Sequence, residues 1–328
     1  MNKIKHLINN SKLKYLCPAD YVNIGFILIL TFLNIVSASV VPYWYLLVLL
    51  NFFLVFFIIN VVYKYETSVD TLDDSGKLSF IRIFRFWYGV FFILIFFKQV
   101  YILIHYIGPP ALDNYLIRLD YKIFGLNPTQ WAYQFQNPYL TEFLQVIYFF
   151  YYLMIIIYGL ELYLWKRYRE FKFAIFVIFT GFYLSYILYM IFPAVGPRFY
   201  LHDFYSIKTQ LPGIFLTDFI RAFLDFGESI PSNVVPNPGD FAQSDAMPSA
   251  HTTLALIIAY LSWKIKSKSF LFYMPYFVLM IIATIYLRYH YVVDIIAGVF
   301  LAIITILIGE YLLKHSEPDK YGKIRGIM

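Results

Sequence analysis

The run RYHYVVD occupies residues 288–294, at the start of the last long apolar segment of the chain. A second polar run, MPSAH at residues 247–251, opens an earlier apolar segment. Ionisable side chains at membrane depth are costly, so their presence marks a functional site by default. Together the runs bring two histidines, an arginine and an aspartate to the ends of apolar segments, which indicates phosphate chemistry at a membrane surface.

The composition excludes an ordinary soluble domain. Of the 328 residues, 61% are hydrophobic and 14% are charged, whereas soluble domains are roughly 25% charged. The 35 phenylalanines and 32 tyrosines suit the aromatic belts at the two membrane interfaces. The single cysteine, Cys17, excludes an internal disulfide and a cysteine-based metal site, and we interpret it as a small apolar residue near the first helix. We therefore expect an integral membrane protein.

Apolar segments long enough to cross a membrane recur along the chain. A spanning helix needs about 20 mainly apolar residues, and about eight stretches qualify. They lie near residues 21–41, 43–63, 83–106, 139–165, 171–192, 249–264, 270–288 and 290–313. The first is longer than the core of a cleaved signal peptide, so we expect it to remain as an anchor.

The basic residues predict the orientation of these spans, because lysine and arginine concentrate in cytoplasmic loops. One alternate set of loops holds 19 of the 26 basic residues, the other set holds 6, and Lys98 lies inside a span. Both termini are therefore expected to be cytoplasmic, and both polar runs extracytoplasmic. The net charge of +6 then reflects topology, and no nucleic-acid partner is expected.

Two of the expected extracytoplasmic loops are long, at residues 108–138 and 193–247. Each contains a stretch with helical spacing of apolar residues, at 112–120 and 214–224, which predicts helices lying in the membrane plane. Residues 227–240 hold three prolines and two glycines and should be irregular. Because loops of this length are usually functional or disordered, we expect a lid or a wall for lipid entry.

His290 and Asp294 are four residues apart, so on a helix they share one face. An aspartate one turn along can accept the proton of one imidazole nitrogen and leave the other free to attack, as in catalytic triads. The alternative interpretation is a stabilising hydrogen bond in a polar cavity.

His251 follows Ser249 at the start of the sixth span, and a helix N-terminus offers unpaired N–H groups to a phosphate. His251 is therefore a candidate general acid for the leaving oxygen. Arginine matches phosphoryl oxygens with its planar fork, and both Arg288 and Arg198 lie on the same expected face. We expect Arg198, Arg288 and Ser249 to bind the substrate phosphate.

The quoted motifs resemble those of the type 2 phosphatidic acid phosphatase superfamily, and within it the branch that contains inositol phosphorylceramide synthase. The resemblance rests on PSAH at residues 248–251 and on YLRYH followed by DIIAG at residues 286–298. It also rests on GPR at residues 196–198 and FGLNP at residues 124–128, and it covers about residues 105–314.

This resemblance implies an all-α fold: a polytopic transmembrane bundle of about eight spans with a six-helix catalytic core. It divides the chain into a cytoplasmic segment with a two-span extension (1–82), a membrane catalytic domain (83–314) and a cytoplasmic tail (315–328). It also implies that His290 is a nucleophile forming a phosphohistidine, Asp294 its partner and His251 the acid. Such enzymes need no metal, so no cofactor is expected.

Three departures from the family pattern affect the phosphate-binding residues. The first motif commonly has a lysine where this chain has Ile191, and the third commonly has Ser-Arg where this chain has Ala283 and Thr284. Arg288 is expected to compensate. A third departure, alanine in place of glycine at Ala250, is minor.

Several residues outside the motifs keep two interpretations. Lys98 is expected to face a cavity or to pair with a carboxylate such as Glu142, because a charged lysine at this depth in the membrane is energetically costly. His202 and Asp203 are expected to form a solvated loop pair, with substrate contact as the alternative. Three further residues could each contact the lipid headgroup or support the fold, with neither role favoured: His105, Asp113 and Arg118.

The sequence leaves several functions open. The expected enzyme handles a phosphorylated or pyrophosphorylated lipid, such as phosphatidic acid or a polyprenyl pyrophosphate. It either hydrolyses this lipid or transfers its phosphoryl-linked headgroup to a lipid or polyol acceptor. A zinc site built from His251, His290 and Asp294 is a second possibility. A non-catalytic lipid binder or flippase would keep the same pocket, and an ion or proton transporter ranks last because no discontinuous-helix repeat is evident.

Overall fold

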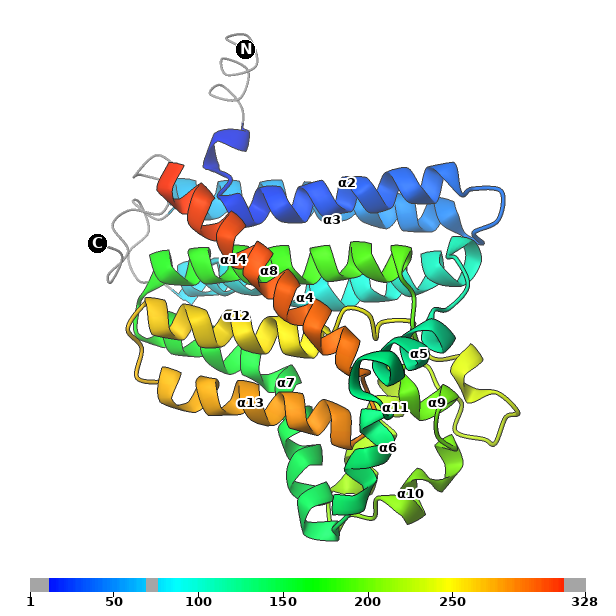
Figure 1. The fold of residues 1–328 in the computed structure, drawn as a ribbon. Helices are drawn as coiled ribbons and strands as arrows, with labels where there is room; N and C mark the ends of the chain where they lie inside the picture. The colour runs from blue at the N-terminus through cyan, green and yellow to red at the C-terminus, as the bar shows by residue number, and fades with distance from the viewer. Residues whose placement is uncertain (1–11, 69–75, 316–328) are drawn as a thin grey trace.

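The computed structural model describes residues 12–68 and 76–315, and within these ranges the chain forms helices and connections without a strand. Figure 1 shows the helices lying side by side as a bundle, with a group of short helices at one end. Six helices are long and apolar enough to cross a membrane. These are α2 (Pro18–Val36), α3 (Trp44–Ser68), α4 (Gly76–Ile107), α7 (Pro138–Leu164), α8 (Tyr168–Ile191) and α14 (Val292–His315). The all-helical membrane fold expected from the sequence is thus confirmed.

Two further apolar helices complete the bundle, α12 (Ala250–Lys264) and α13 (Phe270–Tyr286). They are shorter than the other six; α12 packs against α13, α14 and α8, and α13 packs against α12 and α7. These eight helices coincide with the eight predicted spans. The main differences are that α2 ends at Val36, α3 continues to Ser68 and α4 begins at Gly76, so the last two extend as helices beyond the apolar window.

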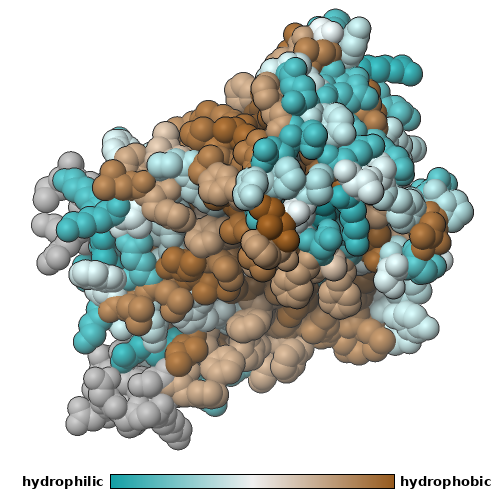
Figure 2. All heavy atoms as spheres, turned by 90° about the horizontal axis from the view of Figure 1, so that it is seen from below, coloured by the Kyte–Doolittle hydropathy of each residue, from teal (hydrophilic) through white to brown (hydrophobic). Residues whose placement is uncertain are grey.

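The surface matches a membrane environment. Figure 2 shows a hydrophobic band across the middle of the molecule, between more hydrophilic surfaces at its two ends. Large apolar side chains on the outer faces of the long helices are exposed, including Phe52, Phe56 and Phe91 at more than 60% each. In water an apolar surface of this extent would drive aggregation, whereas lipid solvates it. The band is therefore the surface that faces the hydrocarbon layer.

Helix α8 is the centre of the packing. It contacts α2, α4, α7, α12 and α14, and it has the largest buried share of the six long helices. Its aromatic side chains interlock with the N-terminal helices: Phe26 of α2 stacks on Tyr183 at 4.4 Å between ring centroids. Tyr183 also donates a hydrogen bond to Asn23 of α2 at 2.6 Å. The core therefore includes the first two helices, while the predicted domain boundary at residue 82 stays a prediction.

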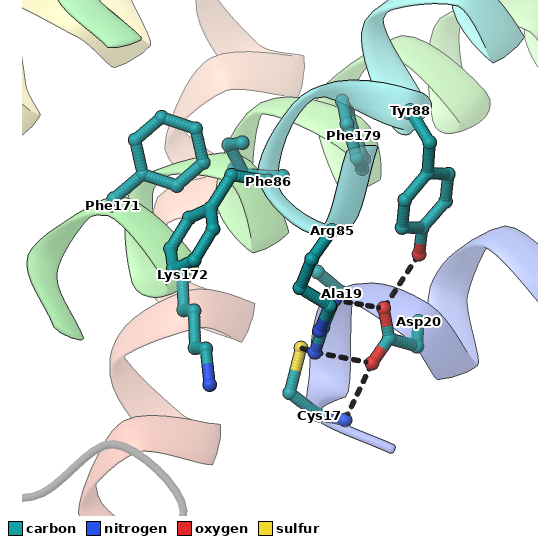
Figure 3. Close-up of a pocket in the computed structure, with 11 residues that line it drawn as sticks. Cys17, Ala19, Asp20, Arg85, Phe86, Tyr88, Phe171, Lys172 and Phe179 are labelled. Carbon is teal, nitrogen blue, oxygen red and sulfur yellow. Dashed lines mark hydrogen bonds and ion pairs between the residues drawn. The ribbon is translucent and has the colours of Figure 1, made fainter. Parts of the chain in front are cut away.

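A buried ion pair fixes α2 to α4 at the end of the bundle where α2 begins (Figure 3). The two Nη atoms of Arg85 each lie 2.9 Å from an oxygen of Asp20, and Tyr88 donates its hydroxyl to the same carboxylate. The backbone N–H of Cys17 donates to Asp20 at 2.7 Å, and the buried Sγ of Cys17 accepts from Arg85 at 3.4 Å. Such bidentate pairing compensates the desolvation of both charges.

Short helices build the opposite end of the bundle. They are α5 (Asp113–Phe124), α6 (Pro128–Ala132), α9 (Pro197–Tyr200), α10 (Ile207–Gln210) and α11 (Thr217–Gly227). The short 3₁₀ turns are η1 (Lys12–Tyr15), η2 (Tyr133–Phe135), η3 (Phe204–Ser206) and η4 (Pro238–Asp240). The helices predicted at 112–120 and 214–224 are confirmed as α5 and α11, and residues 228–240 are irregular apart from η4.

Candidate active site

The two polar runs meet where α12 and α14 begin. The backbone N–H of Ser249 donates to the carbonyl oxygen of Asp294 at 3.0 Å. Gly298 permits this approach, because a Cβ at that position would lie 2.6 Å from the carbonyl oxygen of Ser249. As a result, Nδ1 of His251 lies 3.1 Å from Nε2 of His290. Both imidazoles are buried, at 9% and 3% exposure.

His290 lies in the connection between α13 and α14, and its neighbours determine where its proton sits. Its Nδ1 lies 3.0 Å from the carbonyl oxygen of Ala246 and 3.5 Å from Oδ2 of Asp294. Because a carbonyl can only accept, Nδ1 carries the proton and Nε2 presents a lone pair toward His251. Asp294 lies beside the ring as its spacing suggested, but the carbonyl of Ala246 is the nearer acceptor.

The environment of His290 favours its neutral form. Burial lowers its pKa to about 4, Ala246 opposes this by accepting the Nδ1 proton, and the positive charge of Arg198 adds to the lowering. A neutral imidazole is the form that can attack phosphorus.

His251 is held between aromatic rings from α7. Its ring centroid lies 4.5 Å from that of Tyr148 and 4.2 Å from that of Tyr151. Its Nε2 is buried without a hydrogen-bond partner in the described chain. An unpaired buried nitrogen beside a pair of histidines is a place where a ligand oxygen can bind.

Arg198 reaches the site from the loop after α8. Gly196 has φ of +105°, and a Cβ there would lie 2.6 Å from the carbonyl oxygen of Tyr289, so this loop packs directly on the backbone next to His290. The guanidinium of Arg198 lies 4.8 Å from the ring centroid of Tyr289 and is 4% exposed. Arg198 is thus brought beside His290, as the sequence predicted.

In this structure Arg198 is paired with two carboxylates of the α11 region. Its Nη1 lies 3.0 Å from Asp225 and its Nη2 lies 2.6 Å from Glu228. Burial alone lowers the pKa of Arg198, but Glu228, Tyr289 and Asp225 offset it, so the pKa is raised above its usual value. Arg198 is permanently cationic, and a phosphate has to compete with these carboxylates for it.

Helix α5 connects the loop of Arg198 to the start of α14. Asp113 accepts from the backbone N–H groups of Val195 and Gly196 at 3.0 and 2.8 Å. Two turns later Asp120 accepts from the backbone of Val292 and Val293 at 2.9 and 3.0 Å, which caps α14. Asp113 is fully buried and so acts as scaffolding, the second of its two predicted roles.

Two of the predicted phosphate-binding residues have other contacts. The hydroxyl of Ser249 accepts from the backbone of Thr252 at 3.3 Å and caps α12. Arg288 donates to Gln210 of α10, and its guanidinium lies 5.2 Å from the ring centroid of Tyr133. Of the two arginines, Arg198 is therefore the one whose charge reaches His290.

The structure corrects the expectation for Lys98. Its amine donates to the carbonyl oxygen of Gly227 at 2.8 Å and to the hydroxyl of Ser229 at 3.0 Å, not to Glu142. Glu142 instead accepts several N–H groups at the start of α11. The reason is geometric: α11 folds back between the two residues and supplies partners to both.

His202 and Asp203 do not form the expected pair. Nε2 of His202 lies 2.9 Å from the hydroxyl of Thr129, whereas Asp203 accepts from the backbone of Tyr205. Burial and the nearby charge of Arg288 lower the pKa of His202 to about 3, so it is neutral. His105 and Arg118 are exposed, and their roles stay predictions.

In residues 12–68 and 76–315, no group of three histidine, cysteine, aspartate or glutamate side chains is placed so that it could hold a metal ion. His290 turns Nδ1 toward Asp294 and Nε2 toward His251, so these three residues do not point at one common position.

Comparison with known proteins matches more than half of the chain to a family. The model of the PAP2 superfamily matches residues 114–308, from α5 through most of α14. The chain belongs to the PAP2 superfamily. The matched segment contains His251, His290, Asp294, Arg198 and Arg288.

One curated PAP2 relative shows how far the similarity extends. The chain is 29% identical over 133 residues to a PA-phosphatase related-family protein of Dictyostelium discoideum. That alignment covers 40% of this chain and 22% of the relative, so the chain spans about a fifth of that protein's length. No solved structure matches the chain.

Sequence reasoning missed the residues that hold the site from other helices. Tyr148 and Tyr151 support His251, and Gln145 donates to the hydroxyl of Tyr289 at 3.4 Å. Among 32 tyrosines no sequence pattern distinguishes these two. A signal did exist for Asp113 and Asp120, whose seven-residue spacing places them on one face of an amphipathic helix.

Proposed function

We propose that this protein is a membrane phosphoesterase that acts on a phosphorylated lipid through a phosphohistidine on Nε2 of His290. The observation that carries the proposal is the contact between Nε2 of His290 and Nδ1 of His251 at 3.1 Å, with the cation Arg198 beside it. A neutral imidazole can act as the nucleophile, a second histidine can carry a proton, and a buried guanidinium can stabilise the charge on phosphoryl oxygens.

The proposed reaction has two steps. Nε2 of His290 attacks phosphorus in line, the bond from phosphorus to the lipid oxygen breaks, and a proton from His251 neutralises the leaving oxygen. An acceptor oxygen then attacks the phosphohistidine while His251 takes its proton, which regenerates His290. Arg198 would stabilise the charge on the phosphoryl oxygens in both steps.

The position of the lipid follows from the surroundings of the site. The histidines lie where α12 and α14 begin, and Asp120 of α5 caps α14 at this point. The short helices α5, α9 and α11 gather at this end of the bundle (Figure 1). A lipid can keep its chains in the band and bring its phosphate to His290. We place this end on the extracytoplasmic face, following the distribution of basic residues.

A second candidate, transfer to an alcohol instead of water, is favoured by burial. His290 is 3% exposed, and α11 binds Arg198 above it, so bulk water has little access. Exclusion of water protects a reactive intermediate from hydrolysis. This is the activity expected of the inositol phosphorylceramide synthase branch.

Turnover by His290→Ala tests the proposal. Membranes containing the protein would be supplied with phosphatidic acid, a polyprenyl diphosphate or phosphatidylinositol, each with and without ceramide or diacylglycerol. We expect free phosphate or a new headgroup-bearing lipid from the wild type. The variant should turn over at least roughly 10³-fold more slowly, because loss of a catalytic nucleophile can cost about 10⁶ in kcat. His315→Ala is the matched control, because His315 is exposed at the far end of α14.

The products then distinguish the candidates. Free phosphate indicates hydrolysis, and a new lipid without free phosphate indicates transfer. An acid-labile, base-stable phosphoprotein, and vanadate inhibition that requires His290, are expected in both cases. Equal turnover by wild type and His290→Ala at equal expression would overturn the nucleophile assignment and favour a lipid binder.

A further inference from the structure

Two buried arginines near the site lack the counter-charge that the other two have. In the described part of the chain four arginines are buried: Arg85, Arg198, Arg221 and Arg288. Arg85 and Arg198 form ion pairs with carboxylates, whereas no carboxylate of the described residues lies within ion-pair distance of Arg221 or Arg288. Asp218 and Asp225 act on Arg221 only from a longer distance. Burying an uncompensated charge is strongly unfavourable, so an anion from outside the chain is expected next to this pair.

Arg221 projects from α11 with most of its donors free. It is 6% exposed, its Nε donates to the side-chain oxygen of Gln145 at 3.3 Å, and its Nη1 is buried without a partner in the described chain. A guanidinium has five N–H donors in one plane. One neutral hydrogen bond therefore leaves Arg221 able to bind an anion at its outer edge.

Arg288 likewise has few hydrogen-bond partners. It is 2% exposed, its Nε has no partner, and its Nη1 donates to the neutral amide of Gln210. Its backbone has φ of +66°, the left-handed conformation also found at Lys166 and Lys266 after other helices. Those two lysines point into solvent, whereas the side chain of Arg288 is buried. The end of α13 thus directs this cation inward.

The two guanidinium groups lie close enough for their charges to interact, and Arg221 is linked to Tyr289, the residue before His290. Gln145 bonds Arg221 through its oxygen and the hydroxyl of Tyr289 through its nitrogen, and Tyr289 follows Arg288 in the chain. The charges also act on each other: burial lowers the pKa of Arg288, Tyr133 opposes this, and Arg221 lowers it further. Two cations that repel each other in a buried place are stabilised by a shared anion.

We propose that Arg221 and Arg288 form a second anion subsite, separate from Arg198, that holds a non-scissile phosphoryl group of the donor. The donor is then a lipid with two linked phosphoryl groups. This inference rests on the proposed function, since it places the scissile phosphoryl group at Arg198 and His290. It assigns Arg221, on which the sequence analysis placed no role, to recognition of the substrate.

The subsite would also stabilise the negative charge of the leaving group. When Nε2 of His290 bonds to the terminal phosphorus, the bond from that phosphorus to the bridging oxygen breaks. The electron pair stays on the bridging oxygen, which becomes part of the lipid monophosphate. Arg221 and Arg288 stabilise that charge, so this donor depends less on proton transfer from His251. Water then attacks the phosphohistidine and releases inorganic phosphate.

Paired donors test this subsite. Farnesyl diphosphate and farnesyl monophosphate carry the same lipid chain, so their difference isolates the second phosphoryl group. For Arg221→Gln we expect kcat/KM with the diphosphate to fall roughly 10- to 100-fold, the range for a lost charge-assisted hydrogen bond. The loss with the monophosphate should be several-fold smaller, and Arg221→Lys should restore part of the preference. Arg288→Gln should show the same selective loss.

Lys208→Gln is the matched control, because it removes a positive charge from an exposed position of the neighbouring α10. Equal losses with both donors in both arginine variants would show that these residues only support the fold, and would overturn the proposal. An unchanged preference for the diphosphate would overturn it as well.

A binding experiment separates failure of the subsite from failure of the proposed reaction. Thermal stability of the detergent-solubilised full chain would be measured with inorganic pyrophosphate and with inorganic phosphate, in the wild type and in His290→Ala. The proposal predicts larger stabilisation by pyrophosphate in both proteins and loss of that difference in Arg221→Gln. If phosphate stabilises the wild type as much as pyrophosphate does, and Arg221→Gln removes the stabilisation by phosphate, the two arginines form a site for free phosphate. That result would overturn the donor subsite.

Discussion

His290 is surrounded by groups that assign its tautomer and suppress its charge. The carbonyl of Ala246 accepts the Nδ1 proton at 3.0 Å, and Nε2 is left toward His251. Burial and the charge of Arg198 keep the ring neutral, with a pKa of about 4. The same groups that prepare a nucleophile also make protonation of the folded state unfavourable.

This gives a pH-dependent stability that can be measured. The unfolded chain takes up a proton on this histidine near its ordinary pKa of about 6.5, whereas the folded chain does so only near 4. As the pH falls from 6.5 to 4 the unfolded state binds more protons, so this residue costs the protein up to roughly 1.4 kcal/mol of stability per pH unit.

We therefore expect His290→Gln, which does not titrate, to lose less stability than the wild type between pH 6.5 and 4. Thermal unfolding in detergent across this range measures the difference. His315→Gln, the same change at an exposed position, should follow the wild type. Parallel curves for wild type and His290→Gln would show that the pKa of His290 is not lowered.

At this scale the sequence predicts which residues come together but not their individual contacts. The spacing of His290 and Asp294 predicted their proximity, although His290 lies just before α14 and not on the helix that the spacing assumed. It could not show that the carbonyl of Ala246 lies closer to Nδ1, because that contact depends on how the segment before α12 folds. Every residue has a backbone carbonyl, so the residue types do not show which carbonyl will accept this hydrogen bond.

Helix α11 connects the lipid-facing side of the bundle to the proposed phosphate site. It has no side-chain cap of its own, and Glu142 of α7 takes that role by accepting from the backbone of Ile214 at 2.8 Å and of Leu216 at 2.6 Å. Glu142 also accepts from the hydroxyl of Thr217 at 2.7 Å. At its other end α11 brings Asp225 to Arg198. A carboxylate on α7 thus sets the position of groups at the site.

We expect Glu142→Gln to loosen α11 and to act on Arg198 through it. An N-terminal cap is worth about 1 kcal/mol and the charge at a helix start about 0.3–1 kcal/mol, so the combined effect is roughly 9- to 30-fold. The predicted readouts are a KM raised by this factor and faster amide hydrogen exchange in residues 214–227, with kcat changed less.

Asp218→Asn provides the comparison, because it removes an exposed carboxylate from the first turn of the same helix. It should alter exchange and KM by less than twofold. If Glu142→Gln leaves exchange in α11 at the wild-type rate, the docking role assigned to Glu142 is incorrect.

The amphipathic patterns predicted α5 and α11 as helices, because each buries one face. They did not predict the partners of these helices. Lys98 shows why: its depth in the membrane required a polar partner, and a carboxylate was the obvious expectation. The actual partners are the carbonyl of Gly227 and the hydroxyl of Ser229, which only the return of α11 over α4 makes available.

The whole molecule has two different ends. One carries the loop helices and the proposed site, and the other holds the starts of α2 and α8 and the ion pair of Arg85 (Figures 1 and 3). The sequence predicted all eight bundle helices, because apolar length is a strong signal in a membrane protein. Orientation rests on a different argument, the 19 basic residues assigned to one side against 6 on the other. The predicted orientation determines which compartment supplies the substrate.

Impermeant maleimide labelling of sealed spheroplasts tests this orientation. Ser232→Cys places an exposed thiol among the loops at the site end, and Arg169→Cys places one in the first turn of α8 at the other end. The native Cys17 is buried, and Cys17→Ser removes it while keeping an acceptor for Arg85. We expect labelling of Ser232→Cys in intact spheroplasts, and of Arg169→Cys only after permeabilisation.

Denatured samples of both variants must label equally for the comparison to hold. The reverse pattern would place His290 and the proposed anion subsite on the cytoplasmic face, and the charge bias would then have misassigned every loop together. Because consecutive spans alternate direction, two positions at opposite ends are sufficient to decide the orientation of the entire bundle. The outcome also fixes which membrane leaflet must present a phosphorylated lipid to Arg198.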